Sequence, residues 1–232
     1  MRKEPPEKGP RPGYDERVRL IVSLAEGPRV LHVGACGSRK AINPERRTHF
    51  LQAALVEAGF SVLATDVHEE KLGWLSNLGY ETAHLDAERI PDGERFDSIV
   101  AGELIEHLGR PAEFLEGCKK RLKPGGLLLL STPQPFSPAY LALYAFRPGS
   151  FNPGHTCWFD RQTLGQLLER CGYQVEGVHH VDDLRHFGGS RKARIVAGVH
   201  RELVGFLSAR FKTTLVVAAR ARGESSESSP ET

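Results

Sequence analysis

Short apolar runs and amphipathic stretches alternate along most of this 232-residue chain. The apolar runs are rich in valine, isoleucine and leucine, which predicts buried strands, whereas the stretches between them repeat apolar positions every three or four residues, which predicts helices. The predicted strands are 29–33, 61–65, 81–85, 96–101, 127–132, 173–181 and 213–220. The predicted helices are 46–58, 69–78, 111–121 and 161–171.

This alternation is typical of βαβ units on a mostly parallel sheet, and it predicts an α/β fold. The turn residues agree, because Gly59, Gly79 and the turn at 123–126 stand where predicted helices stop before strands. The length suits a single domain, which we place at 14–221. Residues 1–13, which contain four prolines, and 222–232, which include GESSESSPET, are expected to be disordered tails.

The net charge and the spacing of the cysteines limit the classes of function that the chain could have. A net charge of +2 is too small to indicate nucleic-acid binding by itself. The four cysteines form no C-x-x-C pair, and the chain shows neither a signal peptide nor an apolar run near 18 residues. A cytoplasmic protein without a transmembrane segment is therefore expected.

Polar or small residues follow the first four predicted strands. In an open parallel sheet, ligands bind beyond the carboxyl ends of the strands. The small-residue turn Gly34-Ala35-Cys36-Gly37 follows the first strand and would let a ligand approach backbone amides. Asp66 follows the second strand and suits a ribose diol, Asp86 and Ala87 follow the third and could border an adenine, and Glu103 follows the fourth.

Glu103, Glu106 and His107 form a Glu-x-x-Glu-His cluster, and His155 precedes a later helix. Spacings of three and four residues place the first three side chains near one face if a helix begins there. Two carboxylates and an imidazole could hold a divalent cation or move a proton. The carboxylates could instead contact a cofactor, cap a helix or pair with arginines.

The motif order VLHVGACG, LATDV, HLDAERIP, FDSIVAGELIEHL and LKPGGLLLLSTPQP resembles class I S-adenosylmethionine-dependent methyltransferases. The resemblance implies a Rossmann-like, doubly wound, mostly parallel seven-stranded sheet with an antiparallel last strand. It also implies a methyl donor whose methionine end lies over Gly34, Ala35 and Gly37, whose ribose lies on Asp66, and whose adenine lies near Asp86 and Ala87, with Glu103 beside it. The chain departs from the family pattern at His32, where an acid is usual, and at Cys36, where a second glycine is usual.

Within the family, Glu103, Glu106, His107 and His155 resemble the metal ligands of ubiquinone-pathway O-methyltransferases and of enzymes that methylate the terminal ribose of small RNAs. That resemblance implies a Mg²⁺, Mn²⁺ or Zn²⁺ ion that binds neighbouring hydroxyls, with His155, Glu103 and His107 as catalytic residues. Without a metal, His155 could be a general base or a loop residue that only forms hydrogen bonds. Asp66 could cap the next helix, and Asp86 could belong to a turn.

Two segments are expected to select the methyl acceptor. Residues 136–155 begin with an aromatic stretch that predicts a helix over the crevice, a membrane-surface element or ordinary core. Residues 186–212 are basic and amphipathic, and this pattern indicates either a lid or anionic-partner surface or a solvated helical face, which we favour.

The expected activity is methyl transfer to oxygen of a hydroxylated small molecule, with an apolar or aromatic acceptor and an oligomeric state that the sequence leaves open. An RNA ribose 2′-O-methyltransferase and a non-catalytic cofactor-binding module are the alternatives. A dinucleotide dehydrogenase is disfavoured, because Gly34 and Gly37 lack the G-x-G-x-x-G spacing.

Overall fold

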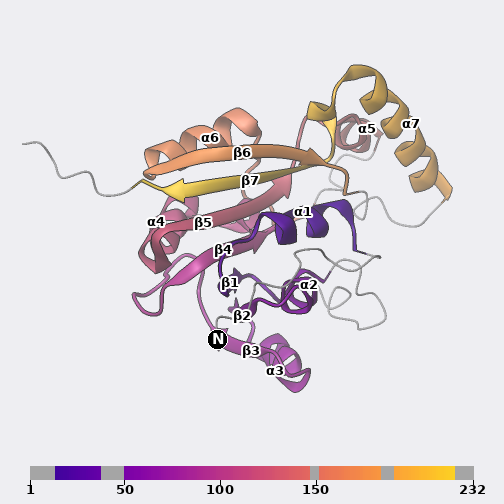
Figure 1. The fold of residues 1–232 in the computed structure, drawn as a ribbon. Helices are drawn as coiled ribbons and strands as arrows, with labels where there is room; N and C mark the ends of the chain where they lie inside the picture. Colours follow the sequence, from indigo (N-terminus) through magenta and orange to yellow (C-terminus); the bar gives the residue numbers. More distant parts are fainter. Residues whose placement is uncertain (1–13, 38–49, 147–151, 184–190, 223–232) are drawn as a thin grey trace, which may run out of the picture.

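The computed structural model describes residues 14–37, 50–146, 152–183 and 191–222 (Figure 1). Seven strands form one sheet in the order β3-β2-β1-β4-β5-β7-β6. Strand β7 runs antiparallel to the other six strands. This arrangement confirms the predicted fold class. The strands are β1 (Arg29–Val33), β2 (Ser61–Asp66), β3 (Glu81–His84), β4 (Phe96–Gly102), β5 (Leu122–Pro133), β6 (Tyr173–Val181) and β7 (Thr214–Ala221).

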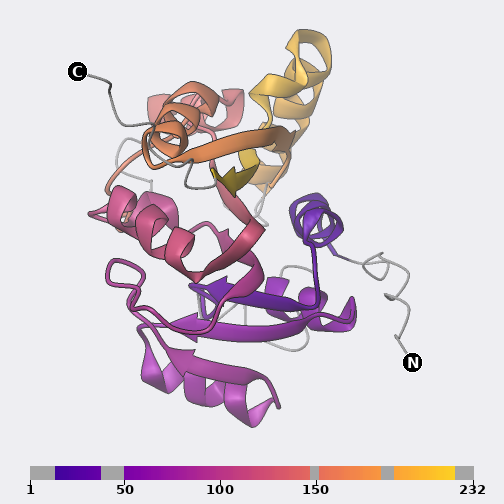
Figure 2. The same cartoon turned by 60° about the vertical axis from the view of Figure 1, so that its left-hand side comes forward.

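Helices cover both faces of the sheet (Figures 1 and 2). On one face, α1 (Glu16–Leu24) and α2 (Leu51–Glu57) pack their apolar sides on the central strands. On the other face, α4 (Pro111–Arg121) and α6 (Arg161–Arg170) do the same, with Phe114, Leu164 and Leu168 buried against the sheet. The remaining helix of the first half is α3 (Glu69–Asn77), which contacts β3. Burial on both faces explains why the central strands are continuous apolar runs.

Two helices, α5 (Pro138–Phe146) and α7 (Arg191–Leu207), pack on each other beyond the end of the sheet towards which β5 points (Figure 1). A short 3₁₀ turn, η4 (Ala209–Phe211), then leads from α7 into β7. Helix α7 buries Val204 and His200 but leaves Phe206 88% exposed. The basic segment is therefore neither a purely solvated face nor ordinary core.

Several element boundaries differ from the sequence predictions. Strand β5 begins at Leu122, five residues earlier than predicted, because Leu122 pairs with Phe96 before an irregularity in the ladder. The predicted turn at 123–126 therefore lies inside the strand, where Gly125 adopts a φ of +75°. Helix α2 is described only from Leu51, so the predicted start at 46–49 lies outside the described residues. Residues 147–151 of the predicted aromatic helix, and the predicted tails apart from Arg222, also lie outside them.

Helix α1 is absent from the sequence predictions. Its signal was present, because Asp15 accepts a hydrogen bond from the amide of Val18 as an N-cap, and Val18, Ile21 and Val22 follow a helical spacing. None of the helices in the described part of the chain combines the length and apolarity needed to cross a membrane.

Candidate functional site

A cavity of about 680 Å³ opens at the carboxyl ends of β1, β2 and β4. This donor cavity is where the fold places ligands in open parallel sheets. Every residue that the sequence assigns to the methyl donor lines it: Gly34, Ala35, Gly37, Asp66, Asp86, Ala87 and Glu103.

The first loop of the donor cavity depends on glycine. Gly34 has a φ of +71° and Gly37 a φ of +46°, which is the left-handed region that side chains disfavour. A Cβ atom at Gly34 would also lie 3.0 Å from a methyl carbon of Leu104. The loop therefore presents bare backbone to the cavity at this position.

Asp66 organises the same loop. Its Oδ2 accepts a hydrogen bond from the amide of Cys36 at 3.0 Å, and its Oδ1 accepts one from the amide of His68 at 3.1 Å. The N-cap of α3 is His68, so Asp66 does not cap the helix. A buried carboxylate that fixes the loop and still faces the cavity is compatible with binding a ribose diol, since each oxygen has a second lone pair.

Asp86 belongs to a turn and also lines the donor cavity. Its Oδ1 accepts a hydrogen bond from the amide of Glu88 at 2.9 Å, which closes a turn, while the residue also lines the donor cavity. Ala87, Leu85 and Leu108 give the same wall an apolar surface.

Both departures from the family motif are buried and uncharged. Burial, together with the charge of Arg17, lowers the pKa of His32 to about 4, and its Nδ1 donates to Oε1 of Gln52 at 2.9 Å. Burial, followed by the charge of Asp66, raises the pKa of Cys36 to about 12. Cys36 is thus a packing residue with an unreactive thiol rather than a nucleophile.

Arg17 is a cavity residue that sequence reasoning missed. It comes from α1, is only 4% exposed and lines the donor cavity. Its Nη1 donates to Oγ of Ser131 at 3.1 Å, and its Nε lies 3.3 Å from a carboxylate oxygen of Asp183. The only sequence signal was its place on the buried side of α1. A guanidinium here suits the carboxylate of an amino-acid ligand.

Glu103 has a strained backbone at the end of β4. Its φ is +56°, whereas every other described residue with a positive φ is glycine. Its amide donates to the carbonyl of Ser131 at 2.9 Å, which holds this conformation against the neighbouring strand. Such strain is often found at functional sites. In this conformation Glu103 lines the donor cavity.

The predicted acid-histidine cluster forms, with three of its four members. Ligand atoms of Glu106, His107 and His155 all lie within 4.8 Å of one another, and Glu103 is outside this group. Glu106 and His107 lie on a 3₁₀ turn, η2 (Ile105–His107), rather than at the start of the next α-helix. The 3₁₀ turn, and not the predicted helical spacing, brings these two side chains together.

Glu106 is a buried carboxyl group, 1% exposed. Its Oε2 accepts a hydrogen bond from Oγ1 of Thr132 at 3.0 Å, while its Oε1 has no hydrogen-bond partner among the described residues. Burial first, and then the negative charge of Glu103, raise the pKa of Glu106 to about 8. The group is therefore poised either to carry a proton or to bind a cation.

A backbone carbonyl orients His107, and His155 packs against its ring. The Nδ1 of His107 lies 2.9 Å from the carbonyl oxygen of Gly154, so Nδ1 carries the proton and Nε2 presents a lone pair. The rings of His107 and His155 meet edge to face at 4.6 Å. His155 arrives from the loop before α6, which sequence spacing alone could not place.

These residues fit a divalent ion. Oε1 of buried Glu106 has no hydrogen-bond partner among the described residues, and a cation would satisfy it. Two imidazoles lie beside this carboxyl group. One carboxylate with two imidazoles suits Mn²⁺ or Zn²⁺ better than Mg²⁺, which prefers oxygen ligands. The fit involves Glu106, His107 and His155.

An aromatic recess of about 410 Å³ lies next to the cluster, between α5 and the loop before α6. Trp158 links the two, because its ring lies 5.2 Å from that of His155 and 5.8 Å from that of Tyr140. Phe136 and Tyr144 also line the recess and are more than half exposed. The aromatic stretch of the sequence thus forms the wall of a pocket.

Known proteins share this organisation. The chain is 36% identical over 120 residues to a protein of Mycolicibacterium smegmatis named "Probable S-adenosylmethionine-dependent methyltransferase", which covers 47% of this chain and 44% of the relative. It is 34% identical over 108 residues to a ubiquinone biosynthesis O-methyltransferase of Dinoroseobacter shibae. That match covers 46% of this chain and 42% of the relative. The matches therefore span less than half the length of these relatives.

Solved structures match over most of the chain. An S-adenosylmethionine-dependent methyltransferase of Archaeoglobus fulgidus superposes with a TM-score of 0.59 at 20% identity, over 88% of this chain and 90% of that one. A second S-adenosylmethionine-dependent methyltransferase, from Mesorhizobium loti, superposes with a TM-score of 0.55 at 20% identity, over 88% of this chain and 95% of that one. At these identities the likeness confirms the fold.

The methyltransferase-domain family matches residues 14–178, which is most of the described chain and includes every residue that lines the donor cavity. The protein therefore belongs to the class I S-adenosylmethionine-dependent methyltransferases, a family whose methyl donor is S-adenosylmethionine.

Proposed function

We propose that this methyltransferase transfers the methyl group to an oxygen atom of a hydroxylated small molecule. The observation that carries the proposal is the position of His107, which lines the donor cavity and also belongs to the cluster with Glu106 and His155. A hydroxyl group bound at the cluster would lie beside the donor. The O-methyltransferase names of relatives such as that of Dinoroseobacter shibae support the same chemistry.

In this proposal the donor cavity orients S-adenosylmethionine through its lining residues. Gly34, Ala35 and Gly37 face the methionine end, and Arg17 binds its carboxylate. Asp66 binds the ribose, and Asp86 with Ala87 borders the adenine. Glu103 lines the donor cavity, and its carboxylate favours the positively charged sulfonium.

When no ion is bound, His155 acts as the base. The acceptor oxygen attacks the methyl carbon, the C–O bond forms as the C–S bond breaks, and S-adenosylhomocysteine leaves. The proton of the hydroxyl passes to the imidazole of His155, while His107 and Glu106 hold the oxygen in position.

A divalent ion, when bound by Glu106, His107 and His155, would lower the pKa of a hydroxyl group that it ligates. Glu106 supplies the negative charge, and the lone pair on Nε2 of His107 points away from its hydrogen bond to Gly154. The aromatic recess next to His155 suits an acceptor with an apolar or aromatic body.

Calorimetric titration of Mn²⁺, Zn²⁺ and Mg²⁺ into protein saturated with S-adenosylhomocysteine tests the cluster. We expect saturable binding of Mn²⁺ or Zn²⁺ that His155→Ala and Glu106→Gln abolish. His84→Ala is the matched control, because His84 is an exposed histidine on β3 outside the donor cavity. Loss of binding in the control as well would point to surface sites.

Methyl transfer is then compared for catechol and phenol. If the ion ligates two neighbouring hydroxyls, Mn²⁺ or Zn²⁺ should stimulate methylation of catechol and leave phenol unaffected. If His155→Ala retains full activity towards catechol, His155 is not the base and the proposal fails. Methylation of an amine but of neither hydroxyl compound would exclude O-methylation of this class of acceptor.

A further inference from the structure

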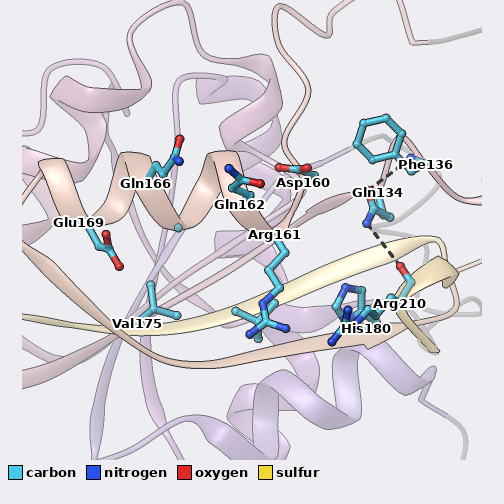
Figure 3. Close-up of a pocket in the computed structure, with 12 residues that line it drawn as sticks. Gln134, Phe136, Asp160, Arg161, Gln162, Gln166, Glu169, Val175, His180 and Arg210 are labelled. Carbon is cyan, nitrogen blue, oxygen red and sulfur yellow. Dashed lines mark hydrogen bonds between the residues drawn. The ribbon is translucent and has the colours of Figure 1, made fainter. Parts of the chain in front are cut away.

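A second cavity of about 630 Å³ lies between α6 and β6, at the edge of the sheet (Figure 3). This α6–β6 groove shares no lining residue with the donor cavity. It shares Phe136 and Asp160 with the aromatic recess. The groove is therefore separate from the donor cavity and adjoins the aromatic recess.

Cationic side chains from different elements converge at one end of the groove. Arg161 begins α6 and extends towards β6, where His180 lies near the end of the strand and Arg210 comes from η4 (Figure 3). In the described part of the chain, neither guanidinium takes part in an ion pair. Two like charges that face one hollow without a counter-charge create a positive potential that attracts anions.

Neither acidic residue of the groove forms an ion pair with Arg161 or Arg210 among the described residues. Oδ1 of Asp160 accepts hydrogen bonds from the amide and the hydroxyl of Thr163, each at 2.7 Å, in a capping box. Glu169 lies near the other end of α6, above Val175 (Figure 3). The nearby Lys212 has its own partner, since its Nζ lies 2.9 Å from Glu16. The two guanidinium groups therefore face the groove without a paired carboxylate from the described residues.

The environment of His180 is consistent with a positive potential at this end of the groove. Burial first, and then the charges of Arg161 and Arg210, lower its pKa. A neutral imidazole can donate one hydrogen bond without competing with an anion for the guanidiniums.

We propose that the cationic end of the α6–β6 groove binds an anionic group with several oxygens, a phosphate monoester or a carboxylate. Arg161 and Arg210 are its principal ligands, because guanidinium groups match the geometry of such oxygens in pairs. His180 donates a further hydrogen bond. The site goes beyond the proposed methyl transfer, because none of its residues touches the donor cavity or the acid-histidine cluster.

Titration of inorganic phosphate into the full chain, followed by amide NMR shifts at low ionic strength, tests the site. We expect saturable shifts around α6 and β6, and affinities weakened about tenfold in both Arg161→Gln and Arg210→Gln. Arg170→Gln is the matched control, because Arg170 is an exposed arginine on the same helix that does not line the groove. Equal weakening in the control, or no saturable binding, would overturn the proposal.

Phenyl phosphate distinguishes the source of the anion. If the anionic group is part of an aromatic acceptor, phenyl phosphate should bind more tightly than inorganic phosphate, and Phe136→Ala should remove the difference. If both bind equally, the site takes a separate small anion; either result supports the anion site. Binding of S-adenosylhomocysteine, measured in every variant, should not change, so failure of this proposal is distinguishable from failure of the proposed methyl transfer.

Discussion

Thr156 binds the backbone carbonyl of Glu106 twice, through its amide at 2.8 Å and through its hydroxyl at 3.1 Å. The same hydroxyl lies 2.7 Å from the carbonyl of Leu108. Because Thr156 follows His155 directly, these contacts fasten the loop that carries His155 to the 3₁₀ turn that carries Glu106 and His107. The cluster thus depends on a residue that contributes no ligand to it.

Thr156→Val removes the hydroxyl contacts and keeps the shape of the side chain. We expect a loss of about 1 kcal/mol in the free energy of unfolding and weaker binding of Mn²⁺ or Zn²⁺, because the position of His155 becomes less restricted. Thr163→Val is the control, since it loses the hydroxyl hydrogen bonds of the capping box on α6 but none to the residues of the cluster. Equal ion binding in wild type and Thr156→Val would show that the loop is held by other contacts.

Gly34→Ala should weaken binding of S-adenosylhomocysteine. The new methyl group would meet Leu104 in the donor cavity and would occupy a backbone conformation that alanine disfavours. Gly125→Ala is a close control, because Gly125 has a φ of +75° and a Cβ atom there would meet nothing within 4 Å. Both variants should lose about 1 kcal/mol of stability, but only Gly34→Ala should lose affinity.

Asp66→Ala tests the ribose position. Because Asp66 also accepts hydrogen bonds from the amides of Cys36 and His68, we expect lower stability, by about 1–2 kcal/mol, together with weaker binding of S-adenosylhomocysteine. Asp160→Ala likewise removes an acceptor of backbone amides, but lies outside the donor cavity, and should lower stability alone. Calorimetry on both variants would refute the ribose role if their affinities were equal.

His32 should make stability sensitive to acid. Its pKa is about 4 in the folded protein against an ordinary value of 6.5, so the unfolded chain binds the proton more readily between these values. The contribution of neutral His32 to the free energy of unfolding is complete above pH 6.5 and is lost as the pH falls towards 4. Between pH 6.5 and 5 the loss is about 2 kcal/mol.

His32→Gln should remove this dependence, which urea unfolding of both proteins at pH 7 and pH 5 would measure. Glu106 has the opposite effect between pH 4.5 and 8, because its pKa is raised in the fold, and stability therefore falls as the pH rises. That contribution is common to both proteins and cancels in their difference. A difference that does not change with pH would mean that His32 is not held neutral.

The fold class and the wall of the donor cavity follow from patterns along the chain. Apolar runs long enough to be buried on both faces dictate parallel strands, and parallel strands bring their carboxyl ends to one edge. For that reason Gly34, Asp66, Asp86 and Glu103 could be assigned to one cavity from motif order alone.

Contacts between distant parts of the chain control the rest of the site. Arg17 reaches the cavity through the packing of α1, and His155 reaches Glu106 through backbone hydrogen bonds of Thr156, more than 40 residues along the chain from η2. The spacing of residues along the chain does not predict such contacts. The pKa of Glu106 and the positive potential at one end of the α6–β6 groove also depend on burial and on charges from several elements, which exist only once the chain has folded.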